Sequence, residues 1–308
     1  TVGAGETVLS DPVAGRVGAW QRLVVSVYLR DGCDTLTGRN RATAPSHPPP
    51  AHGAVAVREP AVSPGFRSVP GDHADDEGGG AFAEPVAVWH WLDALTVVAP
   101  GPVPVVAALG DSLTTGVGSE TGHGWADLLA CRPGPAVVNE GVSGGKVLAP
   151  GTGRPAEQRL SAEVLTKPGI TAVILQAGVN DLGAGARADD LVAAYRRMVA
   201  TAHAAGVRVV GATITPFGGA GYHTPEGERA RQAVNAYVRE QDGFDGLADF
   251  DAALRDPADP VRLLPRYDSG DHLHPSAAGH HALAAAIDLR SLTGPAPHPG
   301  AGPAPPCR

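Results

Sequence analysis

From residue 104 onward, apolar runs of strand length alternate with segments whose apolar residues recur at helical spacing. This alternation is typical of βαβ units, in which helices connect and cover the strands of a parallel sheet. The runs predicted to be strands are 105–109, 136–139, 172–176, 207–214 and 246–250. The expected fold class is therefore α/β, a doubly wound, three-layer domain on a parallel five-stranded sheet. Its binding crevice should lie at the carboxyl ends of the strands.

The helical segments are predicted from spacing and from their end signals. In 189–205 the apolar residues line one face, acidic residues occupy the first turn, and Gly206 ends the helix. A last helix is predicted for 276–289, after Pro275. Trp125 begins the helix after the loop that follows the first strand and carries Ser112, and it is expected to pack in the core.

The first hundred residues follow a different pattern. Short apolar pieces of β type, 23–29 and 54–57, are separated by turn formers, and the acidic, glycine-rich stretch 71–80 reads as an exposed, mobile loop. The last residues are rich in Pro, Ala, Gly and His, a composition typical of disorder. The predicted domains are a smaller β-rich, sandwich-like domain at 1–103, an α/β domain at 104–292 and a disordered tail at 293–308.

Charge and cysteine content exclude several classes of protein. Lys and Arg number 24 against 32 Asp and Glu, a formal net charge of −8, so no basic surface for nucleic acid is expected. No apolar run approaches the ~18 residues of a spanning helix. The three cysteines, Cys33, Cys131 and Cys307, are too few and too widely spaced for a disulfide framework or a cysteine zinc cluster.

Residues capable of nucleophilic catalysis lie at both ends of the α/β segment. The first strand leads directly into Ser112, which is therefore placed at the carboxyl edge of the sheet. Asp271 and His274 lie three residues apart in a turn before the last helix. A serine hydroxyl needs a base to take its proton, and the base works best when a carboxylate holds its tautomer. Ser112, His274 and Asp271 are candidates for these three roles.

Two further segments, 138–145 and 176–181, end strands at the same edge. Acyl transfer needs hydrogen-bond donors directed at the oxyanion of the tetrahedral intermediate, and each is worth roughly 3 kcal/mol of barrier. A glycine backbone N–H and the side-chain amide of Asn180 would provide such donors.

Together these segments form four blocks in order, 110–113, Gly144, 178–181 and 271–274, and through them the chain resembles the SGNH hydrolases, also called the GDSL esterase and lipase family. The resemblance spans about 105–290 and implies a flavodoxin-like sheet. It implies a catalytic triad made by Ser112, Asp271 and His274. It also implies an oxyanion hole made by the Ser112 N–H, the Gly144 N–H and the Asn180 amide. The chemistry assigned to these residues requires no cofactor, and no metal site is predicted.

Within the family the chain is most similar to bacterial members that carry an amino-terminal β-domain. These are often secreted and act on esters of carbohydrates or of small acyl groups, so the resemblance implies an extracellular enzyme with a carbohydrate or small-molecule ester as substrate. It also implies that the chain begins partway through its β-domain. Gly145 departs from the pattern, since many members have Asn or Asp after the block glycine.

A second serine competes with Ser112 for the role of nucleophile. Residues 141–145 satisfy Gly-x-Ser-x-Gly and follow a strand, as the nucleophile elbow of α/β-hydrolases does, which would make Ser143 the attacking residue. No upstream oxyanion motif accompanies it, and Ser112 would then be unexplained. Ser112 is the favoured nucleophile.

Two groups of residues have side chains of the kinds that bind metal ions. His272 and His274, with Asp268 and Asp271, could bind zinc, but three convergent ligands are not evident. The acidic run 72–77 could bind calcium, but its glycine-rich flanks favour a loop.

Other polar residues near the blocks are expected to be structural. Asp111 should anchor its loop, and Asp181 should cap a helix or brace a loop. Of His280 and His281, one should pack and one should face solvent.

The resulting hypothesis is a serine esterase that forms an acyl-enzyme on Ser112. The Gly and Pro content of 116–124, 148–153 and 218–225 indicates an open rim, which favours short acyl groups. Two alternatives remain: an acyltransferase that uses the same triad, and a non-catalytic carbohydrate-binding protein. The complete set of catalytic residues argues against the second.

Overall fold

The computed structural model describes residues 14–16, 25, 65–86, 94–99, 101, 103–121 and 123–294. The chain divides into two compact units, Thr1–Pro100 and Gly101–Arg308. The predicted boundaries after residues 103 and 292 remain predictions.

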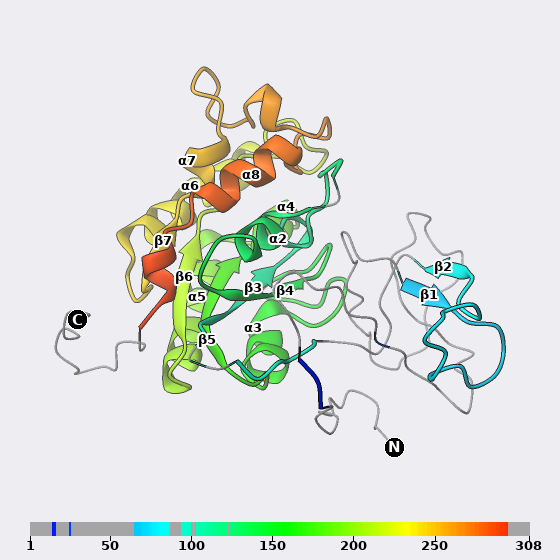
Figure 1. The fold of residues 1–308 in the computed structure, drawn as a ribbon. Helices are drawn as coiled ribbons and strands as arrows, with labels where there is room; N and C mark the ends of the chain where they lie inside the picture. The colour runs from blue at the N-terminus through cyan, green and yellow to red at the C-terminus, as the bar shows by residue number, and fades with distance from the viewer. Residues whose placement is uncertain are drawn as a thin grey trace. The chain divides into compact units, whose positions relative to one another are not determined.

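The second unit is built on a five-stranded sheet whose neighbouring strands are all parallel (Figure 1). Its strands are β3 (Val105–Gly110), β4 (Ala136–Gly141), β5 (Ile170–Gln176), β6 (Arg208–Ala212) and β7 (Gly246–Ala248), in the spatial order β4-β3-β5-β6-β7. The chain moves from β3 outward to β4 and then crosses over to β5, so the direction of winding reverses between β3 and β5. This is the flavodoxin-like order, and it confirms the predicted doubly wound α/β fold.

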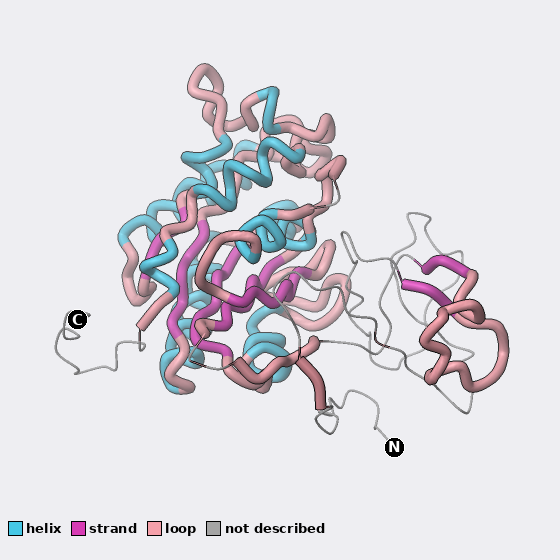
Figure 2. Tube along the Cα trace, in the orientation of Figure 1, coloured by secondary structure: helices cyan, strands magenta, loops and turns pink. Residues whose placement is uncertain are grey.

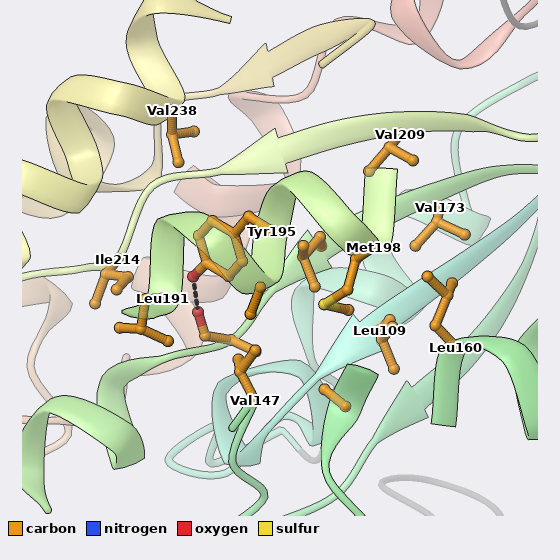
Figure 3. Close-up of a cluster of buried hydrophobic side chains, with 14 of the residues drawn as sticks. Leu109, Val147, Leu160, Val173, Leu191, Tyr195, Met198, Val209, Ile214 and Val238 are labelled. Carbon is orange, nitrogen blue, oxygen red and sulfur yellow. Dashed lines mark hydrogen bonds between the residues drawn. The ribbon is translucent and has the colours of Figure 1, made fainter. Parts of the chain in front are cut away.

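One face of the sheet packs against one set of helices. Successive residues of a strand point to opposite faces, so Leu109, Val173 and Val209 lie on the same side and share one buried cluster (Figure 3). The elements that contribute buried residues to this cluster are α3 (Ala156–Arg159), the π-helical turn η1 (Leu160–Val164), α4 (Val179–Gly183), α5 (Ala188–Ala204) and α6 (Pro225–Glu240).

The opposite face carries a second buried cluster. Val106, Ala108 and Ile174, which alternate with the residues of the first face, belong to it. The elements that cover them are α2 (Trp125–Ala130), α7 (Phe250–Leu254), α8 (Ala277–Ala285) and the 3-10 turn η3 (Leu289–Leu292). Trp125 is fully buried as expected, and its ring meets that of Phe250 edge-on at 5.4 Å between centroids. The sheet thus lies between two helical layers (Figure 2).

The ends of several predicted elements differ from the structure. The strand predicted at 207–214 is β6, which stops at Ala212, and the Ile214 N–H beyond it donates to Asn235 Oδ1 rather than to a neighbouring strand. Strand β7 stops at Ala248 rather than at residue 250, because the Asp249 side chain accepts a hydrogen bond from Ala252 N–H and caps α7. The last helix stops at Ala285 rather than at residue 289, because Asp288 caps η3 through Arg290 N–H.

In the first unit the described strands are β1 (Gly65–Arg67) and β2 (Glu84–Val86), which pair antiparallel. The predicted loop 71–80 lies between them, and the Asp76 carboxylate accepts hydrogen bonds from Gly79 N–H and Ala81 N–H within it. The predicted strand at 54–57, nearly all of that at 23–29, and the tail from residue 295 lie outside the described residues.

Among the described residues, no helix is long and apolar enough to cross a membrane. No group of three or more His, Cys, Asp or Glu side chains gathers among them as a metal site, so the structure assembles neither the zinc set nor the calcium set.

Candidate active site

The carboxyl end of β3 places Ser112 at the start of the short helix α1 (Ser112–Thr115). Asp111 caps this helix: its Oδ1 accepts a hydrogen bond from Leu113 N–H at 3.0 Å. The predicted structural role of Asp111 is therefore confirmed. Its carboxyl group is fully buried, and burial raises its pKa to about 7. Ser112 follows at the point where the winding of the sheet reverses, which is where doubly wound folds bind their ligands.

Gly110 allows α1 to fold back over the neighbouring strand. A Cβ at this position would lie 2.0 Å from Thr114 Oγ1 and 2.3 Å from the Gln176 carbonyl oxygen, so no larger residue fits. The Thr114 hydroxyl donates to Gln176 Oε1 at 2.7 Å and ties α1 to the end of β5. The glycine of the first block is thus needed for the position of Ser112.

The Ser112 hydroxyl, the His274 imidazole and the Asp271 carboxylate form one hydrogen-bonded series. Ser112 Oγ lies 2.8 Å from His274 Nε2, and His274 Nδ1 lies 2.5 Å from Asp271 Oδ2. With Nδ1–H donated to the carboxylate, Nε2 is left to accept the serine proton. The residues predicted from two distant segments therefore meet.

The local chain holds Asp271 ionised. Its Oδ1 accepts hydrogen bonds from Leu273 N–H at 3.0 Å and His274 N–H at 2.8 Å. Partial burial works to raise the pKa of Asp271, but the hydrogen bonds from the His274 ring and from these two backbone groups outweigh it and lower the pKa to about 2. The carboxylate is charged at any pH at which the imidazole can act as a base.

The turn that carries His274 packs closely against the loop after α1. Gly118 has φ +90°, and a Cβ there would lie 2.5 Å from the Pro275 carbonyl oxygen and 2.9 Å from His274 Cβ. His280 on α8 adds a second tie: its Nδ1 accepts from Trp125 N–H at 3.3 Å and its Nε2 donates to the Val117 carbonyl at 3.1 Å. These contacts fix the imidazole of His274 relative to Ser112.

His280 is fully buried, whereas His281 is exposed, as the sequence analysis expected. Burial lowers the pKa of His280 to about 4, so the ring is neutral at pH 7.

The loop after β4 holds the glycine of the second block. Gly144 has φ +74°, and a Cβ there would lie 2.7 Å from Thr152 Oγ1, so both the backbone and the space require glycine. The backbone N–H groups of Ser112 and Gly144 donate to no group within the described ranges. Both donors are therefore available to a ligand.

Asn180, in the first turn of α4, reaches the same loop. Its Nδ2 donates to the Gly145 carbonyl at 3.0 Å, so the amide lies beside the glycine pair rather than in an isolated turn. Asp181 braces the loop as predicted, since its two carboxylate oxygens accept from Val147 N–H at 2.8 Å and Leu148 N–H at 3.0 Å. The second and third blocks are thereby joined.

Ser143, the competing serine, has a different environment. Its Oγ lies 3.1 Å from Thr115 Oγ1, and the Thr115 hydroxyl donates to the Ser112 carbonyl at 2.9 Å. Among the described residues no imidazole forms a hydrogen bond with Ser143. The geometry favours Ser112 as the nucleophile, with Ser143 linking the glycine loop to α1.

Sequence reasoning missed a buried charged cluster beneath the ends of β3 and β4. Arg159 donates to the Glu140 carbonyl at 2.6 Å, and Lys167 Nζ pairs with Glu140 Oε1 at 2.9 Å. All three side chains are almost fully buried. The one feature of the sequence that could have drawn attention to this cluster is that Lys167 is one of only two lysines in the chain.

Comparison with known proteins gives two kinds of similarity. The model of the GDSL-like lipase/acylhydrolase family matches residues 108–282. A structure from Desulfitobacterium hafniense, described as a lipolytic protein of the G-D-S-L family, is 22% identical with TM-score 0.50 and covers 59% of this chain and 96% of that one. The acetylxylan esterase Axe2 from Geobacillus stearothermophilus is 22% identical with TM-score 0.48 and covers 62% and 95%. No curated protein sequence matches the chain significantly. At this identity the first structure supports the fold alone.

Proposed function

The chain belongs to the GDSL-like lipase/acylhydrolase family, and we propose that it is a serine esterase that hydrolyses carboxylic esters through an acyl-enzyme on Ser112. The observation that carries the proposal is the hydrogen-bonded series from Asp271 through His274 to Ser112 Oγ, with distances of 2.5 and 2.8 Å. A binding module has no need of a nucleophile, a base and an orienting carboxylate in contact.

In the first step Ser112 Oγ attacks the ester carbonyl carbon while its proton passes to His274 Nε2. A bond forms between Oγ and the carbonyl carbon, and the carbonyl π electrons move to the oxygen. Asp271 remains ionised because its pKa is about 2, and it stabilises the imidazolium through Nδ1–H. The imidazolium then protonates the leaving alcohol as the ester C–O bond breaks.

The negative oxygen of the intermediate needs donors already in place. The backbone N–H groups of Ser112 and Gly144 have no other acceptor within the described residues, which suits them to this role. The Asn180 amide carries two hydrogens, and the Gly145 carbonyl takes one of them. The other N–H of this amide is proposed as the third donor of the oxyanion hole, after those of Ser112 and Gly144.

In the second step water replaces the alcohol. His274 takes a proton from water, the resulting hydroxide attacks the acyl carbon, and Ser112 Oγ leaves with the proton returned by the imidazole. The Gly and Pro content of 116–124, 148–153 and 218–225 supports short acyl groups. The resemblance to secreted bacterial members extends the proposal to an extracellular enzyme acting on carbohydrate or small-molecule esters.

The test is hydrolysis of p-nitrophenyl esters from acetate to palmitate by the wild type, Ser112→Ala and Ser143→Ala. Ser143 is the matched control, because it is the neighbouring serine whose partner is Thr115 rather than an imidazole. We expect activity highest on acetate and butyrate, lost in Ser112→Ala and largely kept in Ser143→Ala. Loss only in Ser143→Ala, or no hydrolysis of any ester by the folded wild type, would contradict the proposal.

A further inference from the structure

His272 has an unusual backbone conformation two residues before the proposed base. Its φ is +64°, and Gln241 is the one other described residue that has a positive φ without being glycine. The left-handed region is unfavourable for an L-residue with a side chain, in contrast to glycine. Such residues persist where their surroundings hold them, and they are frequent at functional sites.

Asp268 holds His272 in this conformation. Its Oδ1 accepts from His272 N–H at 3.0 Å, and its Oδ2 lies 2.6 Å from His272 Nδ1. The imidazole side chain is 46% exposed and the Asp268 carboxylate 13%. The result is a second histidine–aspartate pair beside the first, with a fixed and accessible ring.

The fixed tautomer defines what His272 can bind. When Nδ1–H is donated to Asp268, Nε2 of the neutral ring is a hydrogen-bond acceptor. No hydrogen bond to Nε2 comes from any residue in the described ranges. An exposed acceptor with a set direction is suited to a hydroxyl donor on a ligand.

The Arg262 guanidinium, a hydrogen-bond donor, lies near the His272 ring, and Gly219 shows how near. A Cβ built on Gly219, which lies in the loop after β6, would be 3.0 Å from His272 Cγ and 3.0 Å from Arg262 Nη1. Arg262 Nε is paired with Asp259 at 3.2 Å, which orients the guanidinium. His272 and Arg262 thus offer an acceptor and donors next to each other, the pattern that neighbouring hydroxyl groups need.

The chemistry of the site determines which part of the ester comes near this pair. His274 Nε2 must protonate the leaving oxygen, so the alcohol part lies on the imidazole side of Ser112. The proposed oxyanion donors of the glycine loop and Asn180 belong to other segments. His272 comes from the same turn as His274, two residues before it, which favours contact with the alcohol part over contact with the acyl group.

We propose that His272, oriented by Asp268 and assisted by Arg262, binds hydroxyl groups of the alcohol part, so that the preferred substrates are esters of sugars or other polyols. This inference rests on the proposed esterase function and names its leaving-group class. His272 is a specificity-determining residue in this proposal, and the proton transfers remain with His274.

The experiment compares three acetate esters: 6-O-acetylglucose, cyclohexylmethyl acetate, which has a similar ring without hydroxyls, and p-nitrophenyl acetate. The variants are His272→Gly, which suits the positive φ, His272→Asn, which keeps a hydrogen-bonding group and tolerates this conformation, and Gln241→Gly. Gln241 caps the far end of α6 and has φ 53°, so its variant relieves the same kind of backbone conformation outside the turn.

We expect the wild type to prefer the glucose ester over the cyclohexylmethyl ester in kcat/KM. His272→Gly should reduce this preference, the ratio of kcat/KM for the two esters, about tenfold, the value of one hydrogen bond. His272→Asn should keep part of the preference and Gln241→Gly all of it.

Three outcomes separate the inference from the function on which it rests. If the wild type hydrolyses p-nitrophenyl acetate but shows no preference for the glucose ester, the inference is overturned and the esterase stands. If His272→Gly keeps the full preference, His272 is not its source and the inference is again overturned. If the folded wild type hydrolyses none of the three esters, the proposed function itself fails.

Discussion

Substituting Gly144 with Ala perturbs the glycine loop in two ways that the structure separates. The first is conformational, because Ala disfavours φ +74°. The second is steric, because the new Cβ would lie 2.7 Å from Thr152 Oγ1 and 3.6 Å from Thr152 Cβ. Thr152→Ala removes the close atom and leaves an ordinary contact, so the double variant retains the conformational part alone.

The magnitudes follow from these two parts. The left-handed conformation costs Ala roughly 1–2 kcal/mol in free energy of unfolding, which lowers Tm by about 2–8 °C in a domain of this size. An oxyanion donor is worth about 100–1000-fold in kcat, and this sets the upper limit of the effect of displacing the Gly144 N–H. The clash adds to the displacement, so Gly144→Ala should approach that limit.

The assay is p-nitrophenyl acetate hydrolysis by Gly144→Ala, Thr152→Ala and the double variant, with thermal unfolding of each as the check on folding. We expect kcat to fall about 100-fold or more in Gly144→Ala with little change in KM, and Thr152→Ala to be nearly unaffected. The double variant should recover part of the loss. A folded Gly144→Ala with wild-type kcat would refute the role of its N–H.

Three further perturbations have defined outcomes. Asp271→Asn should lower kcat about 10⁴-fold with KM unchanged, because an amide group facing His274 Nδ1 favours the wrong tautomer; steady-state kinetics on p-nitrophenyl acetate measure it. The folded-state pKa of His280, about 4, lies below its ordinary value of 6.5, so the unfolded chain binds the additional proton between these values. Its contribution to the free energy of unfolding, about 3 kcal/mol, should be complete above pH 6.5 and lost as pH falls toward 4. Urea unfolding at pH 7 and 4.5 measures this: the free energy of unfolding should differ less between the two pH values in His280→Gln than in the wild type. Asp251→Ala removes one of the two carboxylates that pair with the buried Arg231 guanidinium at 2.7 Å, while Glu228 remains. It should lower the free energy of unfolding by about 1.5–3 kcal/mol, measured by the same method at pH 7.

The pattern of apolar residues was sufficient to predict the five parallel strands and their order along the chain. The five apolar runs became β3 to β7 because each is bounded by turn or helix signals that local chemistry enforces. The errors fell at element ends, where one side chain decides. Asp249 and Asp288 cap the next turn through a single hydrogen bond each, which hydrophobic spacing does not reveal.

Within the site, the meeting of Ser112 with His274 could be expected from sequence, because both follow strands or turns at one edge of the sheet. The links between the blocks could not. The Thr115–Ser143 contact and the pair formed by Asn139 Nδ2 and the Thr114 carbonyl join residues 25 or more positions apart. They depend on strand register and loop path, which are set by packing and leave no local pattern.

The nucleophile is tested most directly by covalent trapping. The wild type is treated with a fluorophosphonate, and the modified peptide is located by mass spectrometry, with Ser112→Ala and Ser143→Ala treated in parallel. We expect one adduct per chain, on Ser112, present in Ser143→Ala and absent from Ser112→Ala. An adduct on Ser143, or no adduct on the folded wild type, would contradict the assignment of Ser112 as the serine that carries the acyl group.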